Sequence, residues 1–328
     1  MSEALFSRVE PIQTMADGTV KQINPFSGTE VWTVPGRGNR PLSHPAQDPN
    51  PLTADAHSQT CAFCSGRMLD TPPEKSRILP SGEIQRGLLP HELDASTPAF
   101  RRVPNLFEIV SYDYWHDNYG YTMDPDVARH KERYVADEAG REHVLNVVRT
   151  KLKAAGKDAE LDDDSLLALA DGFFGGGHDV IIGARHFVDG ATDDSQLASS
   201  GTLSPDEHFL LTTFTAESTR ELYQRNRYAD YVAVFQNWLS PAGASFDHLH
   251  KQLVAIDALG MAANQENAIL RKHPNMYNDW AVGYAAKRNL VIAENEYAVL
   301  FAGFGHRYPT LEVYSKSCLL YTSPSPRD

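Results

Sequence analysis

One segment near residue 250 restricts what this chain can fold into more than any other. From Phe246 to Ile256 the sequence reads FDHLHKQLVAI, and its apolar second half predicts a β-strand. Side chains alternate between the two faces of a strand, so we expect His248, His250 and Gln252 on one face. Two imidazoles and an amide would then share one small surface.

The loop before this strand has the composition of an anion-binding loop. Between Asn237 and Ser245 it contains Pro241, Gly243 and small side chains. Such residues let backbone N–H groups approach an anion closely. The whole stretch therefore predicts a phosphate-binding loop followed by a strand that carries a nucleophile.

The charge of the chain limits its partners. The 328 residues include 30 Lys+Arg and 43 Asp+Glu, a formal net charge of −13, which argues against an extended nucleic-acid backbone as a partner. A small phosphate held by local arginines is still allowed. Arg37 and Arg40, in PGRGNRPL, are candidates, because guanidinium groups match phosphate oxygens. Taken alone, the same loop is more simply interpreted as a solvent-exposed basic turn.

The compartment is predicted from what the sequence lacks. No apolar run reaches the about 20 residues that span a bilayer, and the N-terminus MSEALFSRVEPIQ lacks the basic and then apolar order of a signal peptide. We therefore expect a cytoplasmic protein. In a reducing compartment the pair Cys61 and Cys64 is expected to bind a metal or act in redox chemistry rather than form a structural disulfide, and Cys318 stands alone.

The CxxC pair predicts half of a zinc site. Its Pro- and Ser-rich flanks disfavour a helix-opening redox motif, and tetrahedral zinc needs two further ligands besides Cys61 and Cys64. His186 and His248 lie at ends of expected strands and are the first candidates, with His178 as a competing ligand. A lone histidine is more often an ordinary hydrogen-bonded side chain, but a CxxC shifts that balance. We predict a Cys₂His₂ zinc site that ties this loop to the core sheet.

His250 is the predicted nucleophile. A metal on His248 would fix the strand that carries it, and a neutral imidazole attacks phosphorus with one nitrogen when the other donates to a carbonyl. Gln252 and the backbone amides from Gly243 to Ser245 can donate to phosphate oxygens. This arrangement fits a covalent nucleotidyl-histidine intermediate. A third histidine at position 252 would suit a hydrolase, whereas glutamine indicates transfer.

The remaining patterns predict a mixture of helices and strands. Strands are expected over residues 30–34, 101–110, 180–182, 231–235, 289–293, 297–302 and 310–314. Helices are expected over residues 125–156, 162–174 and 204–228, where Ser204 and Pro205 supply the cap and the first position. The helices before residue 174 are interpreted as an accessory layer.

Taken in order, these motifs resemble the galactose-1-phosphate uridylyltransferase family of the histidine-triad superfamily. The family patterns are N-P-[LF]-[ST]-G, R-x-x-R-P, C-x-x-C-x-G, P-N-x-F, G-x-H-[ED]-V and N-x5-G-x-S-x2-H-x-H-x-Q. Their matches here begin at Asn24, Arg37, Cys61, Pro104, Gly176 and Asn237. Two departures, Asp247 and Leu249 at positions where the family often has proline, bear on the substrate more than on the chemistry.

The resemblance implies a fold and a set of residue roles. The implied fold is α+β, a histidine-triad-like antiparallel sheet with helices. The chain would contain one full copy of this fold and the start of a second copy, and a zinc ion would tie the N-terminal loop to the sheet. The implied zinc ligands are Cys61, Cys64, His186 and His248, and the implied catalytic residues are His250 and Gln252. Nucleotide and phosphate contacts are implied for Arg37, Arg40, Asn105, Asn237, Gly243, Ser245 and Gln252.

The same resemblance predicts how the chain is divided. Residues 1–22 are expected to be a surface leader, and residues 23–258 a first domain with a helical insert at about residues 112–174. Residues 259–316 are expected to form a linker and the start of an incomplete second domain. The final segment, residues 317–328, reads as a non-native tail.

The implied activity is nucleotidyl transfer by a ping-pong mechanism. The expected partners are a nucleotide sugar, UDP- or ADP-hexose, and a sugar phosphate or phosphate, with no nucleic acid and no membrane. Members of the family form dimers, so a homodimer is among the expectations. Two alternatives remain at this point: a dinucleoside-polyphosphate phosphorylase that uses the same histidine, and a zinc-stabilised nucleotide-binding protein without catalysis.

Overall fold

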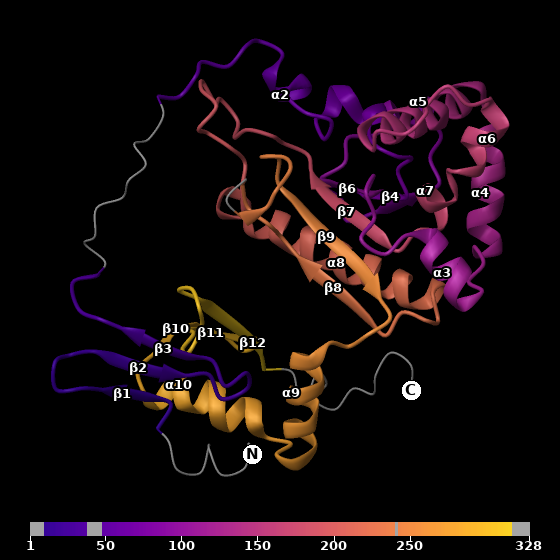
Figure 1. The fold of residues 1–328 in the computed structure, drawn as a ribbon. Helices are drawn as coiled ribbons and strands as arrows, with labels where there is room; N and C mark the ends of the chain where they lie inside the picture. Colours follow the sequence, from indigo (N-terminus) through magenta and orange to yellow (C-terminus); the bar gives the residue numbers. More distant parts are fainter. Residues whose placement is uncertain (1–9, 38–47, 240–241, 317–328) are drawn as a thin grey trace. The chain divides into compact units, whose positions relative to one another are not determined.

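The computed structural model describes residues 10–37, 48–239 and 242–316 (Figure 1). Within it the chain forms two compact units. One consists of residues 47–258, and the other combines residues 1–46 with residues 259–328. Each unit has its own sheets and its own hydrophobic core.

A six-stranded antiparallel sheet is the framework of the unit formed by residues 47–258. Its strand order is β5-β4-β6-β7-β9-β8. The strands are β4 (Ser76–Ile78), β5 (Ile84–Arg86), β6 (Phe100–Pro104), β7 (His178–Gly183), β8 (Tyr231–Phe235) and β9 (His250–Ile256). The central strand β7 is buried along its whole length, as its run of β-branched residues predicts.

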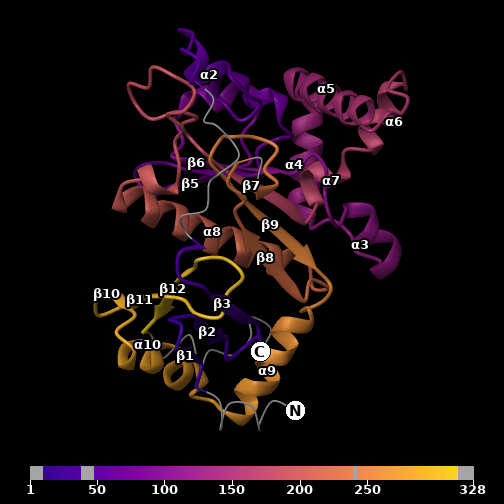
Figure 2. The same cartoon turned by 60° about the vertical axis from the view of Figure 1, so that its left-hand side comes forward.

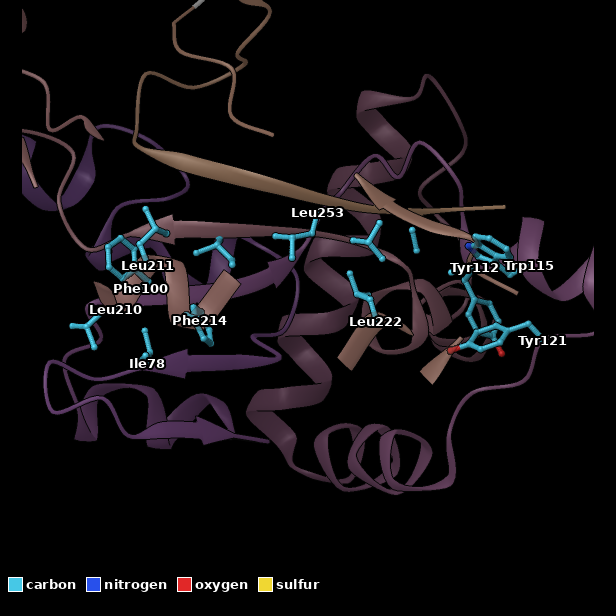
Figure 3. Packing of buried hydrophobic residues seen from close by; sticks show 14 residues of the cluster. Ile78, Phe100, Tyr112, Trp115, Tyr121, Leu210, Leu211, Phe214, Leu222 and Leu253 are labelled. Carbon is cyan, nitrogen blue, oxygen red and sulfur yellow. The ribbon is translucent and has the colours of Figure 1, made fainter. Parts of the chain in front are cut away.

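One long helix covers one face of this sheet. Helix α8 (Pro205–Arg225) begins with a capping box in which Ser204 accepts from the amide of Glu207 and the Glu207 side chain accepts from the amide of Ser204. Its apolar side packs on Ile78, Phe100 and Leu253 of the sheet, as Figure 3 shows. Strand alternation therefore assigns Leu253 to the helix side and its neighbour Gln252 to the opposite face.

A helical insert separates β6 from β7. It contains α3 (Tyr112–Tyr119), α4 (Pro125–Ala136), α5 (Glu138–Ala154), α6 (Asp163–Ala168) and α7 (Asp171–Gly175). Asp124, Asp137 and Asp162 cap three of these helices with their side chains. The insert has its own core around Tyr134 and Phe173. The helix predicted over residues 125–156 is divided into α4 and α5, because Asp137 caps a new helix that begins at Glu138. The helix predicted over residues 162–174 is divided into α6 and α7, and Ala170 is the residue before α7.

The second unit is built from both ends of the chain. Strands β1 (Ile12–Thr14), β2 (Val20–Ile23) and β3 (Glu30–Thr33) form one antiparallel sheet, and β10 (Val291–Glu294), β11 (Ala298–Ala302) and β12 (Leu311–Ser315) form another. Helix α9 (Met261–Lys272), the π-helical turn η6 (Tyr277–Val282) and α10 (Gly283–Lys287) complete it (Figure 2). Ile12 and Phe26 pack against the core formed by Phe301 and its neighbours.

The predicted leader over residues 1–22 is not featureless, because β1 and most of β2 fall within it. Ile12 donates its amide to the Tyr284 hydroxyl at 3.0 Å, and the Asn24 side chain donates to the carbonyl of Phe304 at 3.4 Å. Residues 10–37 therefore belong to the same compact unit as the C-terminal segment. The predicted domain limits themselves stay a prediction, and the predicted non-native tail lies outside the described residues.

Two strand boundaries differ most from the sequence prediction. The strand predicted over residues 101–110 ends at Pro104, after which Asn105 forms a turn by accepting from the amide of Phe107 at 3.0 Å. The strand predicted from Phe246 begins only at His250.

Among the described residues, no helix is both long enough and apolar enough to cross a lipid bilayer.

Candidate metal and nucleophile site

Four side chains from three separate segments converge at one end of the central sheet. Cys61 and Cys64 come from the turn between α2 (Ala56–Gln59) and η2 (Ser65–Asp70), His186 follows β7, and His248 precedes β9. Their ligand atoms all lie within 4.8 Å of one another. Cys64, His186 and His248 are buried, and Cys61 is half-buried. The four residues that the sequence predicts as zinc ligands thus form one cluster.

The spacing of the four atoms fits a tetrahedral zinc ion. Zinc–sulfur bonds of about 2.3 Å and zinc–nitrogen bonds of about 2.0–2.1 Å at tetrahedral angles place two sulfurs about 3.8 Å apart, and sulfur and nitrogen about 3.6 Å apart. The two Sγ atoms lie 3.8 Å apart. The four Sγ–Nδ1 distances run from 3.4 to 3.8 Å. Two thiolates and two imidazoles are also the donor set that zinc prefers.

The histidine of this cluster that leads into β9 has a fixed tautomer. Nε2 of His248 donates to the carbonyl of Gly183 at 2.7 Å, so the proton is on Nε2 and the lone pair of Nδ1 faces the cysteines. The pKa of Cys64 is lowered, chiefly because the Cys61 thiol donates to it. One thiolate is therefore favoured in the cluster even before an ion is considered.

The cysteine turn is held by a glycine and a buried arginine. A β-carbon at Gly66 would lie 2.9 Å from the carbonyl oxygen of Ser58, so only glycine fits there without a backbone shift. Arg101 of β6 donates to the carbonyl of Phe63, inside the turn, at 3.3 Å. Burial lowers the pKa of Arg101 to about 10. The turn is thereby anchored to the sheet.

His250 is oriented by the same segment that carries His248. Its Nδ1 donates to the carbonyl oxygen of His248 at 2.7 Å, so the lone pair is on Nε2. Burial lowers the pKa of His250, and its ring packs edge-on against Phe63 with 5.4 Å between the centroids. Within the described residues, Nε2 has no hydrogen-bond partner. A neutral imidazole with a free Nε2 lone pair is the state that a nucleophile requires.

Gln252 is oriented by His178, the competing zinc ligand of the sequence prediction. His178 lies outside the metal cluster, because its Nδ1 accepts from the amide of Ile109 at 3.0 Å. The proton is therefore on Nε2, which lies 3.0 Å from Oε1 of Gln252. With its oxygen engaged in this way, the Gln252 amide nitrogen is left to donate elsewhere.

Asn105 adds a second amide nitrogen beside the same histidine. Its Oδ1 accepts from Phe107, and its Nδ2 lies 3.1 Å from Nε2 of His178. Both of these nitrogens carry protons in the tautomer just described, so they do not satisfy each other. Asn105 thus presents an amide donor that an acceptor on a ligand could use.

The loop before His248 has an unusual backbone. Leu239 has a φ of 64°, a value that residues other than glycine seldom adopt, and Gly243 has a φ of 87°. Ala242 and Ala244 both donate their amides to the carbonyl of Leu239. A β-carbon at Gly243 would lie 3.8 Å from Nδ2 of Asn237, so these two predicted phosphate ligands are neighbours.

The chain matches DUF4921, described as a domain of unknown function, over residues 15–325. It belongs to this family. Among curated proteins, none matches the chain.

Two solved structures are similar to this DUF4921 chain. One is an ADP-glucose phosphorylase from Arabidopsis thaliana with bound ADP-glucose, with a TM-score of 0.48, 17% identity, and coverage of 90% of this chain and 68% of that chain. The other is a galt-like protein from Arabidopsis thaliana, with a TM-score of 0.47, 17% identity, and coverage of 80% and 62%. At these TM-scores the likeness assigns no activity.

Three further predicted phosphate ligands of the DUF4921 chain are left untested by the structure. Ser245 is exposed in the loop before His248. Arg37 follows β3 in the other compact unit, and Arg40 lies outside the described residues. The phosphate contacts predicted for all three stay predictions.

Two contacts in the site are not predicted from the sequence. Phe63 packs against both His248 and His250, with centroid distances of 6.1 and 5.4 Å. His178 reaches Gln252 because β7 and β9 pair with Val180 opposite Gln252, which places His178 diagonally across the strands. The glycines before His178 indicate that the start of this strand faces a ligand. The register between β7 and β9 cannot be predicted from one sequence.

Proposed function

We propose that this DUF4921 protein is a nucleotidyltransferase that works through a nucleotidyl-histidine on His250. The observation that carries the proposal is the 2.7 Å hydrogen bond from Nδ1 of His250 to the carbonyl of His248. It holds the imidazole in the tautomer with a free Nε2 lone pair. Burial lowers the pKa of His250 and so keeps the ring neutral near pH 7.

The first half-reaction is a substitution at phosphorus. The Nε2 lone pair of His250 attacks the α-phosphorus of a nucleotide sugar, the bond from that phosphorus to the bridging oxygen breaks, and a sugar 1-phosphate leaves with the electron pair. In the second half-reaction an oxygen of phosphate or of another sugar phosphate attacks the same phosphorus. The P–N bond then breaks and returns the lone pair to Nε2, while the proton on Nδ1 stays in place.

The charge that develops on the phosphate oxygens is met by oriented donors. The amide nitrogen of Gln252, freed by His178, is the side-chain donor on the same strand as His250. The loop containing Asn237 and Gly243 supplies backbone and amide donors just before the strand. Donors that are already oriented lower the barrier without having to reorganise during the reaction.

Zinc bound by Cys61, Cys64, His186 and His248 would have a structural role rather than a catalytic one. Four protein ligands close a tetrahedral site, and zinc bound there supplies folding energy rather than an open coordination position. The cluster fixes the His248 ring, and the backbone of the same residue supplies the carbonyl that orients His250. Metal binding and nucleophile orientation are therefore coupled through one residue.

The donor is proposed to be a nucleotide sugar, UDP- or ADP-hexose, and the acceptor a phosphate or sugar phosphate. The similar phosphorylase structure contains ADP-glucose, which makes ADP-glucose with phosphate a reasonable first pair to assay.

Isotope exchange tests the two-step mechanism. With labelled glucose 1-phosphate and unlabelled nucleotide sugar, and no other acceptor, we expect label to enter the nucleotide sugar. A nucleotidyl-enzyme gives this exchange without phosphate, because the labelled sugar phosphate reacts with the covalent intermediate. Overall turnover without partial exchange would show a direct transfer between two bound substrates and would overturn the proposal.

A further inference from the structure

A cavity of about 500 Å³ lies on the helix side of the central sheet. Arg102 of β6 lines it. The next residue, Val103, packs with Val180 and Phe63 on the opposite face of the sheet, the face that carries His250. Because adjacent side chains of a strand point to opposite faces, the sheet separates this cavity from His250. Its other walls come from α4, α7 and the last turn of α8.

The lining is strongly cationic for a chain of net charge −13. Its cationic side chains are Lys75, Arg86, Arg102, Arg129, Arg133 and Arg225, and its carboxylates are Glu74, Asp126 and Glu221. Six positive groups face three negative ones in the lining, and the buried Asp179 behind it pairs with Lys75 and Arg102, which leaves an excess of two positive charges. A concentration of one sign of charge in a concave, partly desolvated site attracts ligands of the opposite sign.

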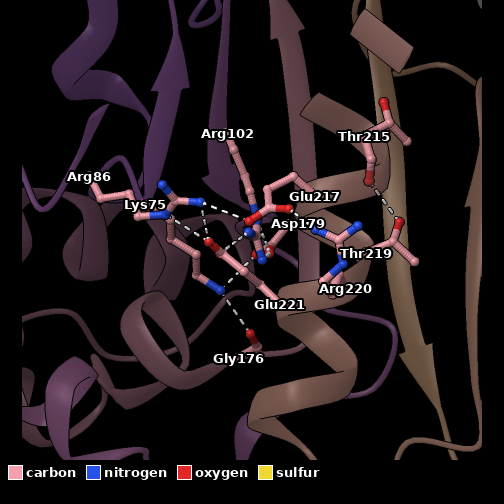
Figure 4. A network of polar contacts seen from close by, with 10 residues as sticks. All are labelled: Lys75, Arg86, Arg102, Gly176, Asp179, Thr215, Glu217, Thr219, Arg220 and Glu221. Carbon is pink, nitrogen blue, oxygen red and sulfur yellow. Dashed lines mark hydrogen bonds and ion pairs between the residues drawn. The ribbon is translucent and has the colours of Figure 1, made fainter. Parts of the chain in front are cut away.

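The carboxylates in the lining are already paired. Glu221 accepts from Arg86 and Arg102, at 2.7 Å in each case, and Figure 4 shows these contacts together with Lys75. Glu74 is buried against Arg77, a residue outside the cavity, at 2.6 Å. Asp126 pairs with Arg129. None of the three is therefore left to neutralise a further cation.

Two polar side chains in the lining, Arg225 and His130, have nitrogens without a hydrogen-bond partner among the described residues, and a third, Arg133, has only one hydrogen bond. Within the described residues, the Arg225 side chain has no hydrogen bond or ion pair, and the Arg133 side chain donates from Nη2 to the carbonyl of Gly87. Nδ1 of His130 is buried without a hydrogen-bond partner. A β-carbon at Gly87 would lie 3.5 Å from both Nδ1 of His130 and Nη2 of Arg133, so these two nitrogens converge beside a glycine that leaves them room.

We propose that this cavity binds a small phosphorylated ligand. Its phosphate would lie on Arg133, Arg225 and His130, because guanidinium groups pair with phosphate oxygens in two-point contacts. Val127, Phe173 and Phe174 line the cavity and provide an apolar wall for the remainder of the ligand. The volume falls within the range of about 300–1,000 Å³ that is usual for small-molecule sites. The site does not depend on the function proposed for His250.

Titration with inorganic pyrophosphate tests this site. In isothermal titration calorimetry of the full chain, we expect Arg133→Gln and Arg225→Gln each to weaken pyrophosphate binding by about tenfold or more, because each removes a charged donor. Arg227→Gln is the matched control, since Arg227 lies two residues from Arg225 on the Tyr228 ring and outside the cavity lining. It should bind pyrophosphate as the wild type does.

Hydrogen exchange locates the bound probe and guards against misfolded variants. Pyrophosphate should slow amide exchange in residues 125–136 and 221–226 of the wild type, and a His250→Gly variant should keep this protection. Unchanged melting temperatures of the two arginine variants would show that folding is intact. Equal affinity in wild type and both variants, or no binding at millimolar pyrophosphate, would overturn the proposal.

Discussion

His178 and Gln252 are joined across two strands by a hydrogen bond of 3.0 Å from Nε2 to Oε1. The amide of Ile109 fixes the histidine tautomer from the other side of the ring. The result is a glutamine whose amide nitrogen is held ready to donate next to His250. In the proposed mechanism, His178 would be a positioning residue that acts through Gln252.

A double-mutant cycle tests this coupling. His178→Ala should slow formation of the nucleotidyl-enzyme by about tenfold, the usual worth of one hydrogen bond of about 1–1.5 kcal/mol. Gln252→Ala should cost at least as much, and the double variant should be no slower than Gln252→Ala alone. Additive losses would show that His178 acts independently. Because His178 is outside the cluster, zinc content should not change in any of these variants.

Removal of a cluster ligand should affect metal content and stability together. Cys61→Ser leaves three of the four ligand atoms that converge in the structure, so we expect bound zinc to fall well below one equivalent and the melting temperature to drop. Metal analysis and thermal unfolding measure the two effects. The matched control is His178→Ala, which should retain one zinc. A wild-type protein purified without zinc, and unaffected by chelator, would contradict the metal assignment.

Asp179 anchors the cation-rich side of the sheet. It is fully buried and contacts Lys75 at 2.7 Å and Arg102 at 2.5 Å. Asp179→Asn would leave two buried cations without their shared partner, so we expect a loss of about 3–5 kcal/mol in the free energy of unfolding. Urea denaturation measures it, with the exposed Asp189→Asn as control, for which we expect a change within about 0.5 kcal/mol.

The same carboxylate predicts acid sensitivity. Burial by itself would raise the pKa of Asp179, but Arg102 and then Lys75 outweigh burial and lower it below 3.8. The stabilisation is therefore present above pH 3.8 and is lost as the pH falls through the lower folded-state value. The difference in stability between wild type and Asp179→Asn should shrink in that range. A constant difference from pH 7 down to pH 2 would contradict this assignment.

Glu108 has the opposite effect on the pH dependence of stability, because its pKa is raised rather than lowered. Burial raises its pKa from 4.5 to about 7, and its Oε1 is buried without a hydrogen-bond partner. The folded state keeps the proton while the unfolded chain releases it, so stability should decline as the pH rises from about 4.5 to 7. Glu108→Gln removes this decline and should be more stable than wild type above pH 7 by roughly 2–3 kcal/mol.

Urea denaturation at pH 5 and pH 8 measures the Glu108 effect. The exposed Glu142→Gln is the control and should follow the wild type at both pH values. A Glu108→Gln variant that gains nothing at pH 8 relative to pH 5 would contradict a carboxyl group that is protonated near neutral pH.

The sequence predicted the mixed fold of antiparallel sheet and helices and the four residues of the metal cluster. The HxHxQ strand and the CxxC were recognisable because each is local, and a zinc ion needs a fixed number of ligands, which led to His186 and His248. The helix starting at Ser204 was also predicted, because its capping box is local.

What the sequence could not predict depends on pairing between distant segments. Strands β4 and β5 have only three residues each and contain Arg77 and Arg86, so they lack an apolar alternation. Ile12 pairs with Gln22 of β2 and packs against the core around Phe301, which is nearly 290 residues away in the sequence. The bond between His178 and Gln252 and the cavity behind Arg102 likewise depend on strand register and on helices packed from elsewhere in the chain.

The most direct test of the central claim is the intact mass of the protein after incubation with a nucleotide sugar and no acceptor. With UDP-glucose or ADP-glucose, we expect the wild type to gain the mass of one nucleotidyl group, located on His250, and to lose it when phosphate or a sugar phosphate is added. His250→Gly should gain nothing, while His178→Ala should gain the same adduct more slowly. An adduct that persists in His250→Gly, or none on the wild type with either donor, would contradict a nucleotidyl-His250 mechanism.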